Sequence, residues 1–274
     1  MFSLKLASIA VLLFFALWRH AVAETEVDVE LVLAVDVSRS MSAGELEIQR
    51  RGYAEAIRDP QVVKAISEGL VGRIAVTYLE WAGDGNQRVV VPWMEIANMD
   101  DAQSFSARLV ATSGFTMRYT SISGALLTAT RLFEGNGFAG LKKVIDVSGD
   151  GPNNQGVPVE EARDLALGNN IVINGLPLMT NEGGLSRFSI PNLDKYYTDC
   201  VIGGPGSFSL PVRSWEEFPE AVRRKLVLEL AGYEMPETGR IPVVKVQSGG
   251  DGNADKFDCL IGERLRLQWD GSLQ

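Results

Sequence analysis

Blocks of apolar and polar positions alternate along the chain and predict strands and helices in turn. Near-continuous apolar runs, typical of fully buried parallel strands, occupy residues 29–36, 142–148 and 171–179. Helical spacing separates these runs, at residues 42–58, 101–111, 121–133, 159–167 and 214–231. Strands that alternate with helices indicate an α/β fold with a doubly wound, mostly parallel central sheet and helices on both of its faces.

The remaining patterns complete this prediction. Residues 72–81 and 87–93 form two apolar runs around Gly83-Asp-Gly-Asn86, which predicts a hairpin, and Pro92 suits an edge strand. A short strand-like segment follows at 207–211. Beyond Gly232 the chain is rich in Gly and Pro, which favours an irregular C-terminal tail. We therefore expect one domain over residues 24–232 and a tail, 233–274, packed on it.

The first 23 residues differ in composition from the rest. Lys5 precedes a 12-residue apolar run over 6–17, and Ala21-Val-Ala23 gives a small-x-small cleavage site. This pattern predicts a secretory signal peptide and a periplasmic or secreted mature protein. The alternative is a membrane anchor, but a spanning helix needs about 20 apolar residues. No membrane insertion is expected after signal removal.

The charge and the histidine content of the chain exclude several classes of function. The first 23 residues hold two of the 26 basic residues and none of the 35 acidic ones, so the mature chain has a formal charge of −11. They also hold His20, the only histidine. A mature chain without imidazole excludes serine-histidine triads and most zinc sites. Its acidity makes it a poor candidate for binding nucleic acid or anionic membranes.

Polar loops follow two of the predicted strands and open one of the predicted helices. The first is Asp36-Val-Ser38-Arg-Ser40, the second spans 120–124 and the third spans 150–154. Ligand sites in open α/β folds lie just past the carboxyl ends of strands. Carboxylates and hydroxyls without histidine or thiolate form an all-oxygen site, which suits Mg²⁺, Mn²⁺ or Ca²⁺. Two carboxylates only balance such an ion, so an Asp or Glu of a protein partner could supply another anionic oxygen.

These loops resemble the metal-ion-dependent adhesion site of the von Willebrand factor A (VWA) family, and the order of elements from 29 to 231 resembles that fold. The resemblance implies divalent-cation-dependent binding of an unknown protein partner rather than catalysis. It also implies metal ligands at Asp36, Ser38, Ser40, Thr120 and Asp150. The stretches DVSRSMS, RYTSISGAL, DVSGDGPNN, DCVIGGPG and RRKLVLE are similar, more narrowly, to DUF1194-type bacterial secreted proteins with a VWA-like domain.

Several alternatives stay open. Arg118-Tyr119 stands where VWA members often have Gly-Gly, so Ser121 is the alternative to Thr120 in the second loop. Asp36 and Ser38 could merely cap the following helix. Asp36 could also be the nucleophile of a metal-assisted phosphoryl-transfer hydrolase, although Ser38 stands where such enzymes carry a general-acid Asp. A structural exported protein with a vestigial site is a further alternative.

Two features of the C-terminal part complete the predictions. Cys200 and Cys259 are the only cysteines, and in an oxidising compartment they predict a disulfide that ties the tail to the domain, with two buried thiols as the alternative. Asp251-Gly-Asn-Ala-Asp255 opens like an EF-hand loop, but Lys256 replaces its glycine and Gly262 its final Glu. We interpret this segment as a solvated turn.

Overall fold

The computed structural model describes residues 23–112, 114, 116–180, 189–231, 244–245 and 256–272. The predicted signal peptide, apart from its last residue, lies outside the described residues, and so does the Asp251–Asp255 segment.

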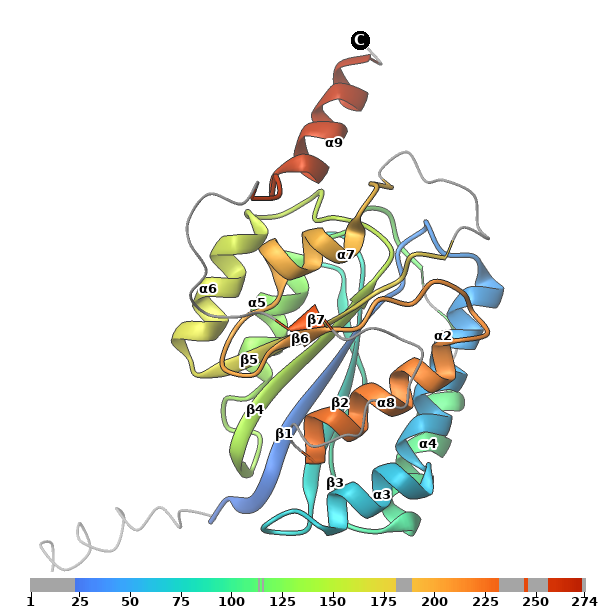
Figure 1. Ribbon diagram of the computed structural model, residues 1–274, viewed down its shortest axis with the longest axis vertical. Helices are drawn as coiled ribbons and strands as arrows, with labels where there is room; N and C mark the ends of the chain where they lie inside the picture. The colour runs from blue at the N-terminus through green and yellow to red at the C-terminus, as the bar shows by residue number, and fades with distance from the viewer. Residues whose placement is uncertain are drawn as a thin grey trace, which may run out of the picture.

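A central sheet forms the middle layer of the molecule (Figure 1). Its strand order is β3-β2-β1-β4-β5-β6-β7. β1 pairs in parallel with β2 and β4, β4 in parallel with β5, and β3 runs antiparallel to β2 at the edge. The strands are β1 (Thr25–Asp36), β2 (Ile74–Trp81), β3 (Gln87–Ile96), β4 (Phe138–Gly149), β5 (Ile171–Pro177), β6 (Phe208–Ser209) and β7 (Val244–Lys245).

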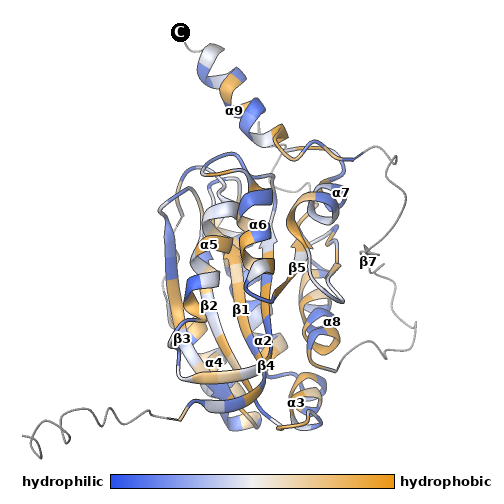
Figure 2. Ribbon diagram, turned by 90° about the vertical axis from the view of Figure 1, so that its left-hand side faces the viewer, coloured by the Kyte–Doolittle hydropathy of each residue, from blue (hydrophilic) through white to orange (hydrophobic). Residues whose placement is uncertain are grey.

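Helices cover both faces of the sheet (Figure 2). The helices are α2 (Ala43–Ile57), α3 (Pro60–Ser67), α4 (Met99–Val110), α5 (Ile122–Leu132), α6 (Val159–Gly168), α7 (Leu193–Tyr196), α8 (Phe218–Ala231) and α9 (Ile261–Ser272), and a π-helical turn, Tyr197–Val201, follows α7. Successive β1 side chains point to opposite faces and enter two apolar cores, Leu31 and Leu33 on the side of α2, α4 and α8, and Val32 and Ala34 on the side of α5 and α6. The predicted doubly wound fold is confirmed.

Local sequence explains where α2 begins. The Ser42 hydroxyl accepts a hydrogen bond from the Glu45 amide (3.3 Å), and the Glu45 carboxylate accepts one from the Ser42 amide (2.6 Å). This reciprocal pair is the capping box that the sequence predicts. The capping box fixes the start of α2 at Ala43, so the loop that connects β1 to α2 is short.

The structure corrects the predicted elements at several points. α3, α7 and the π-helical turn were not predicted, and α8 begins at Phe218 rather than at residue 214. The tail, predicted to be irregular, contains the helix α9. Gly262 and Gly271 weaken the helical signal of this segment, and its contacts with the domain are not visible in its own sequence. Among the described residues, no helix combines the length and apolar character needed to cross a membrane.

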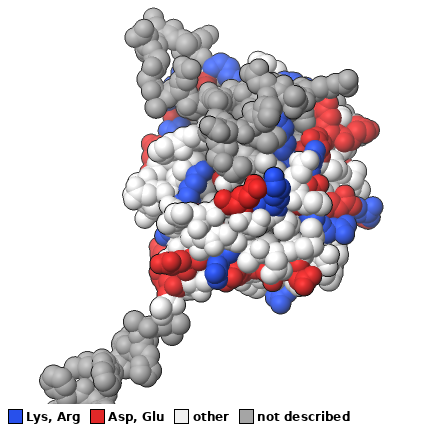
Figure 3. All heavy atoms as spheres, turned by 60° about the horizontal axis from the view of Figure 1, so that its bottom comes forward, with Lys and Arg blue, Asp and Glu red and all other residues white. Residues whose placement is uncertain are grey.

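The end of the molecule where the parallel strands begin has a surface of mixed charge. Figure 3 shows acidic and basic side chains interspersed among uncharged residues on this face. No large area of a single sign stands out there, so this view gives no reason to place an electrostatic binding surface at the amino ends of the strands.

Candidate metal-binding site

The first and third polar loops meet where β1 and β4 end side by side. Asp36 is fully buried at the end of β1, and the Ser38 amide donates to its Oδ1 at 2.7 Å. The Ser38 and Ser40 hydroxyls lie 2.9 Å apart, and Ser40 Oγ donates to Oδ1 of Asp150 at 2.8 Å. Hydrogen bonds through the Ser38 amide and the two hydroxyls therefore connect four of the five predicted ligands into one group.

The two carboxylates of this group have no basic partner. Within the described part of the chain, neither Asp36 nor Asp150 forms an ion pair with Lys or Arg, and Oδ2 of Asp36 has no hydrogen-bond partner. Burial, and then the charge of Asp150, raise the pKa of Asp36 well above its ordinary value of 3.8. Burial raises the pKa of Asp150 to about 6, against the hydrogen bond from Ser40. The fold thus holds two acids together that a nearby cation would stabilise as carboxylates.

The donor set also decides which kind of site this is. No group of three or more His, Cys, Asp and Glu side chains with metal-binding geometry occurs among the described residues. The candidate therefore depends on two carboxylates and neutral hydroxyls, which are oxygen donors of the kind that Mg²⁺ and Ca²⁺ prefer. The residues present fit such an ion, because an unpartnered carboxylate oxygen lies within this group.

The second loop joins the site through its backbone. The Arg39 amide of the first loop donates at 3.0 Å to the carbonyl of Met117, three residues before Thr120. Thr120 exchanges two hydrogen bonds with Asn154 of the third loop, from its amide to Oδ1 (2.9 Å) and from the Asn154 amide to its carbonyl (2.8 Å). Thr120 is a buried residue. No described contact joins its hydroxyl to Asp36 or Asp150.

Ser121, the alternative ligand, has a different structural role. It is the N-cap residue of α5, and its hydroxyl accepts a hydrogen bond from the Gly124 amide at 3.0 Å. It also lies 3.4 Å from the Ser123 hydroxyl. A hydroxyl that caps a helix in this way is already used by the fold, which leaves Thr120 as the better candidate in this loop.

Three further residues shape the site and were not singled out in the sequence. Asn153 and Asn154 are buried, and Asn153 Oδ1 accepts a hydrogen bond from the Ser123 amide at 3.0 Å. At Gly149, a Cβ atom would lie 3.0 Å from Oδ2 of Asp36 and 3.2 Å from the Trp81 ring, so a side chain there would push against the carboxylate. The Gly-Asp-Gly-Pro-Asn-Asn composition could have suggested a turn with structural amides, but not their partners.

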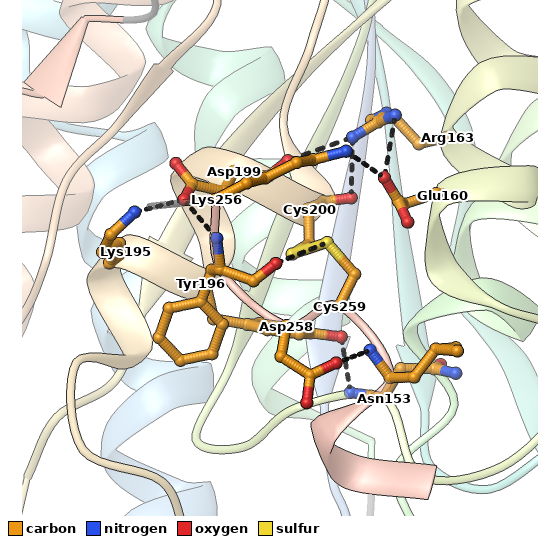
Figure 4. The surroundings of a disulfide bond; sticks show 12 residues. Asn153, Glu160, Arg163, Lys195, Tyr196, Asp199, Cys200, Lys256, Asp258 and Cys259 are labelled. Carbon is orange, nitrogen blue, oxygen red and sulfur yellow. Dashed lines mark hydrogen bonds and ion pairs between the residues drawn. A yellow bond between two sulfur atoms is a disulfide. The ribbon is translucent and has the colours of Figure 1, made fainter. Parts of the chain in front are cut away.

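The predicted disulfide is present. Cys200, in the π-helical turn, is bonded to Cys259, with their Cα atoms 5.5 Å apart (Figure 4). Both cysteines belong to the apolar core on the side of α5 and α6. Polar contacts lie beside them: Arg163 Nη1 donates to the Cys200 carbonyl at 3.2 Å, and the Phe257 amide donates to Oδ2 of Asp199 at 3.0 Å. The bond therefore attaches the end of the tail to the domain beside α6 and α7.

Comparison with solved structures defines the class of the fold. The chain is similar to a von Willebrand factor type A protein from Catenulispora acidiphila (15% identity, TM-score 0.52, 75% of this chain and 43% of that one). It is also similar to proximal thread matrix protein 1 of the mussel byssus, a structure with a zinc-occupied MIDAS motif (14%, 0.52, 76% and 49%). A third similar structure is the pilus adhesin SpaC of Lactobacillus rhamnosus GG (10%, 0.54, 82% and 37%). The chain spans less than half of each of these proteins, and the likeness shows a VWA-like fold.

The family itself is defined by sequence. Residues 26–234 match the family described as protein of unknown function DUF1194, so the chain belongs to this family and has its VWA-like domain. No curated protein sequence matches the chain. The matched range ends before the disulfide cysteine Cys259 and helix α9.

Proposed function

We propose that this protein is a divalent-cation-dependent protein-binding module. In this proposal Asp36, Ser38, Ser40, Thr120 and Asp150 hold Mg²⁺, Mn²⁺ or Ca²⁺, and the ion binds an Asp or Glu carboxylate of a protein partner. The observation that carries the proposal is the buried, unpartnered Oδ2 of Asp36, in a connected group with two hydroxyls and a second carboxylate. Buried carboxylates without a counter-charge are costly, and a bound cation would remove that cost.

Each residue has a role that follows from its contacts. The Ser38 amide binds one oxygen of Asp36, and among the described residues the other oxygen has no hydrogen-bond partner. Ser40 connects the first loop to Asp150 across the sheet. A bound divalent ion supplies Lewis acidity, and because the two carboxylates only balance its charge, it would favour one more anionic oxygen. Two similar structures, a mussel byssus protein with a zinc-occupied MIDAS motif and a pilus adhesin, support metal use and binding to other proteins.

Export and the absence of catalysis are part of the same proposal. Residues 1–23 would be removed as a signal peptide, and a disulfide suits the oxidising periplasm or exterior. We prefer binding to phosphoryl transfer because position 38 offers only a hydroxyl, which lies at hydrogen-bond distance from Ser40. A phosphatase would need a carboxylic acid there to protonate its leaving group.

A melting experiment tests the metal site. A site formed by loops that meet only in the folded protein binds the native state alone, so saturating metal must stabilise it. At one hundred times the dissociation constant, Mg²⁺ or Mn²⁺ should add about 2.7 kcal/mol and raise the melting temperature by about 5 °C or more, relative to EDTA. Identical melting curves in metal and in EDTA would show that these residues serve only as caps and core.

Two variants and a capture experiment complete the test. Asp36→Ala should abolish the response to metal, whereas Asp251→Ala should respond like the parent, because that segment is interpreted as a solvated turn. The mature protein should then retain a partner from periplasmic extract in Mg²⁺ and release it in EDTA, and Asp36→Ala should retain nothing in either. Metal-independent retention by both proteins would contradict the proposed binding mode.

A further inference from the structure

Helix α9 lies on the third loop of the candidate site. Figure 1 shows α9 rising from the end of the molecule where this loop lies. Oε1 of Glu263 accepts a hydrogen bond from Asn153 Nδ2 at 2.7 Å, and Arg266 Nη1 donates to the Asn154 carbonyl at 3.3 Å. A Cβ at Gly262 would lie 2.1 Å from the Asn153 carbonyl oxygen, so the first turn of α9 touches the loop backbone directly.

The same helix also contacts Tyr119, the residue directly before the second loop. The Arg266 guanidinium lies 4.7 Å from the centre of the Tyr119 ring, which indicates a cation–π contact. Tyr119 has φ 68°, a left-handed conformation that a bulky side chain adopts only when its surroundings impose it. The next residue is Thr120, the proposed ligand. The contact with α9 therefore acts on a strained position directly beside the site.

Two asparagines connect α9 to the amides of the second loop. Asn153 contacts Glu263 with its Nδ2 and receives the Ser123 amide on its Oδ1. Asn154 contacts Arg266 with its carbonyl and receives the Thr120 amide on its Oδ1. Each asparagine thus has one polar group on α9 and another on the loop that carries the proposed hydroxyl ligand, so a displacement of α9 would disturb both.

The disulfide fixes the beginning of this arrangement. Cys259 lies two residues before α9, and Cys200 follows Tyr196, whose hydroxyl accepts a hydrogen bond from the Asn153 amide at 3.1 Å. Figure 4 shows Asn153, Tyr196 and the two cysteines grouped in this region. The matched family range ends at residue 234, so α9 is an addition to the part of the chain that defines the family.

We propose that α9 is a disulfide-anchored clamp that positions the second and third loops, with Glu263 and Arg266 as positioning residues. Metal affinity then depends on whether the Cys200–Cys259 bond is intact. This inference rests on the proposed metal function, but the clamp itself exists in the metal-free protein. Its primary readout is therefore hydrogen exchange of the Thr120 and Ser123 amides in EDTA, which needs no bound metal.

Two glycines of α9 provide a matched pair of variants. Gly262→Ala favours the helix by its intrinsic propensity, yet its new methyl group collides with the Asn153 backbone and must displace α9. Gly271→Ala makes the same chemical change where no atom lies within 4 Å. For Gly262→Ala we expect the Thr120 and Ser123 amides to exchange about tenfold faster and Mg²⁺ to bind about tenfold more weakly. A tenfold change corresponds to the loss of about one hydrogen bond to the loop. Gly271→Ala should behave like the parent.

Reduction of the disulfide and two variants of Glu263 extend the test. Reduced protein, and the Cys200→Ser/Cys259→Ser variant, should show the same faster exchange. Glu263→Ala should accelerate exchange at Ser123, whereas Glu263→Gln keeps an acceptor for Asn153 and should restore the parent rate. Unchanged exchange in Gly262→Ala and in the reduced protein would overturn the clamp. If Gly262→Ala and the reduced protein exchange faster than the parent, but the parent binds no metal, the clamp is supported and only the proposed function is overturned.

Discussion

Two pairs of acids with little or no solvent exposure lie on or beside the central sheet, and they are compensated in different ways. Asp146 on β4 and Glu229 on α8 share the buried Lys225, whose Nζ lies 2.8 Å from Asp146 Oδ1 and also pairs with Glu229. Asp36, at the end of β1, and Asp150, directly after β4, are connected through the Ser38 amide and the Ser38 and Ser40 hydroxyls. In the first pair the chain supplies its own cation, and among the described residues the second pair has none.

The difference has a physical consequence. Burial raises the pKa of Asp146 to about 7, and Lys225 opposes that rise, so the ion pair keeps part of the acid ionised within the core. Asn174 Nδ2 adds a hydrogen bond of 2.8 Å to Glu229. This group therefore anchors α8 to the sheet as a structural element. Among the described residues nothing supplies a positive charge to the second pair, so protonation or a bound cation would stabilise it, which is a property expected of a binding site.

The largest expected effect comes from removing the internal cation. Lys225→Met leaves two buried carboxylates without a positive charge, and breaking such a pair costs about 3 to 5 kcal/mol. Urea unfolding should show this loss. A Lys225→Met/Asp146→Asn/Glu229→Gln variant, which removes the charges together, should recover a large part of it. A loss below about 1 kcal/mol in the single variant would show that the cluster does not anchor α8.

The choice between Thr120 and Ser121 gives the next effect. Thr120→Val keeps the shape and the backbone bonds to Asn154 but removes the hydroxyl, so Mg²⁺ should bind about tenfold more weakly, or about 1.4 kcal/mol. Stability in EDTA should hardly change. Ser121→Ala should instead cost about 1 kcal/mol of stability, since it removes the α5 cap, with little effect on affinity. Titration calorimetry and urea unfolding separate the two, and the reverse pattern would make Ser121 the ligand.

Neutralising Asp36 should raise the stability of the protein without metal and lower it with metal, relative to the parent. Asp36→Asn keeps an acceptor for the Ser38 amide and removes one of two neighbouring buried charges. In EDTA near pH 7.5 we expect the variant to be more stable than the parent by about 1 kcal/mol, because a like-charge and desolvation cost disappears. In Mg²⁺ it should be less stable than the parent, which alone gains from the ion. A variant that is less stable in both conditions would mean that the Asp36 carboxylate is structural.

The pH dependence is the smallest effect. Asp150 has a folded-state pKa of about 6, above its ordinary value of 3.8. Its contribution to stability is therefore complete below about pH 4 and lost as pH rises through 6. Metal offsets that loss, so the Mg²⁺-induced rise in melting temperature should grow between pH 5 and pH 7. The Asp146 group titrates in both conditions and cancels in the difference. A shift that is constant across this range would contradict proton displacement at Asp150.

Local pattern alone determined the β-α alternation, the start of α2 and the polar loops at the ends of β1 and β4. These features could be predicted because periodicity reports burial, a capping box lies within four residues, and parallel strands bring their carboxyl ends to one edge. Asp36, Ser38, Ser40 and Asp150 could therefore be expected at one place from the sequence. The disulfide followed from there being only two cysteines in a chain predicted to be exported.

Tertiary structure decided the rest. Lys225 and Glu229 have the spacing of an exposed helical pair, and only the packing of α8 against β4 shows that they are buried with Asp146. The roles of Asn153 and Asn154 depend on contacts with residues 30 and 34 positions away in sequence. The docking of α9 depends on a surface that exists only once those loops are folded. Such contacts leave no periodic signal, because each is made by single residues far apart along the chain.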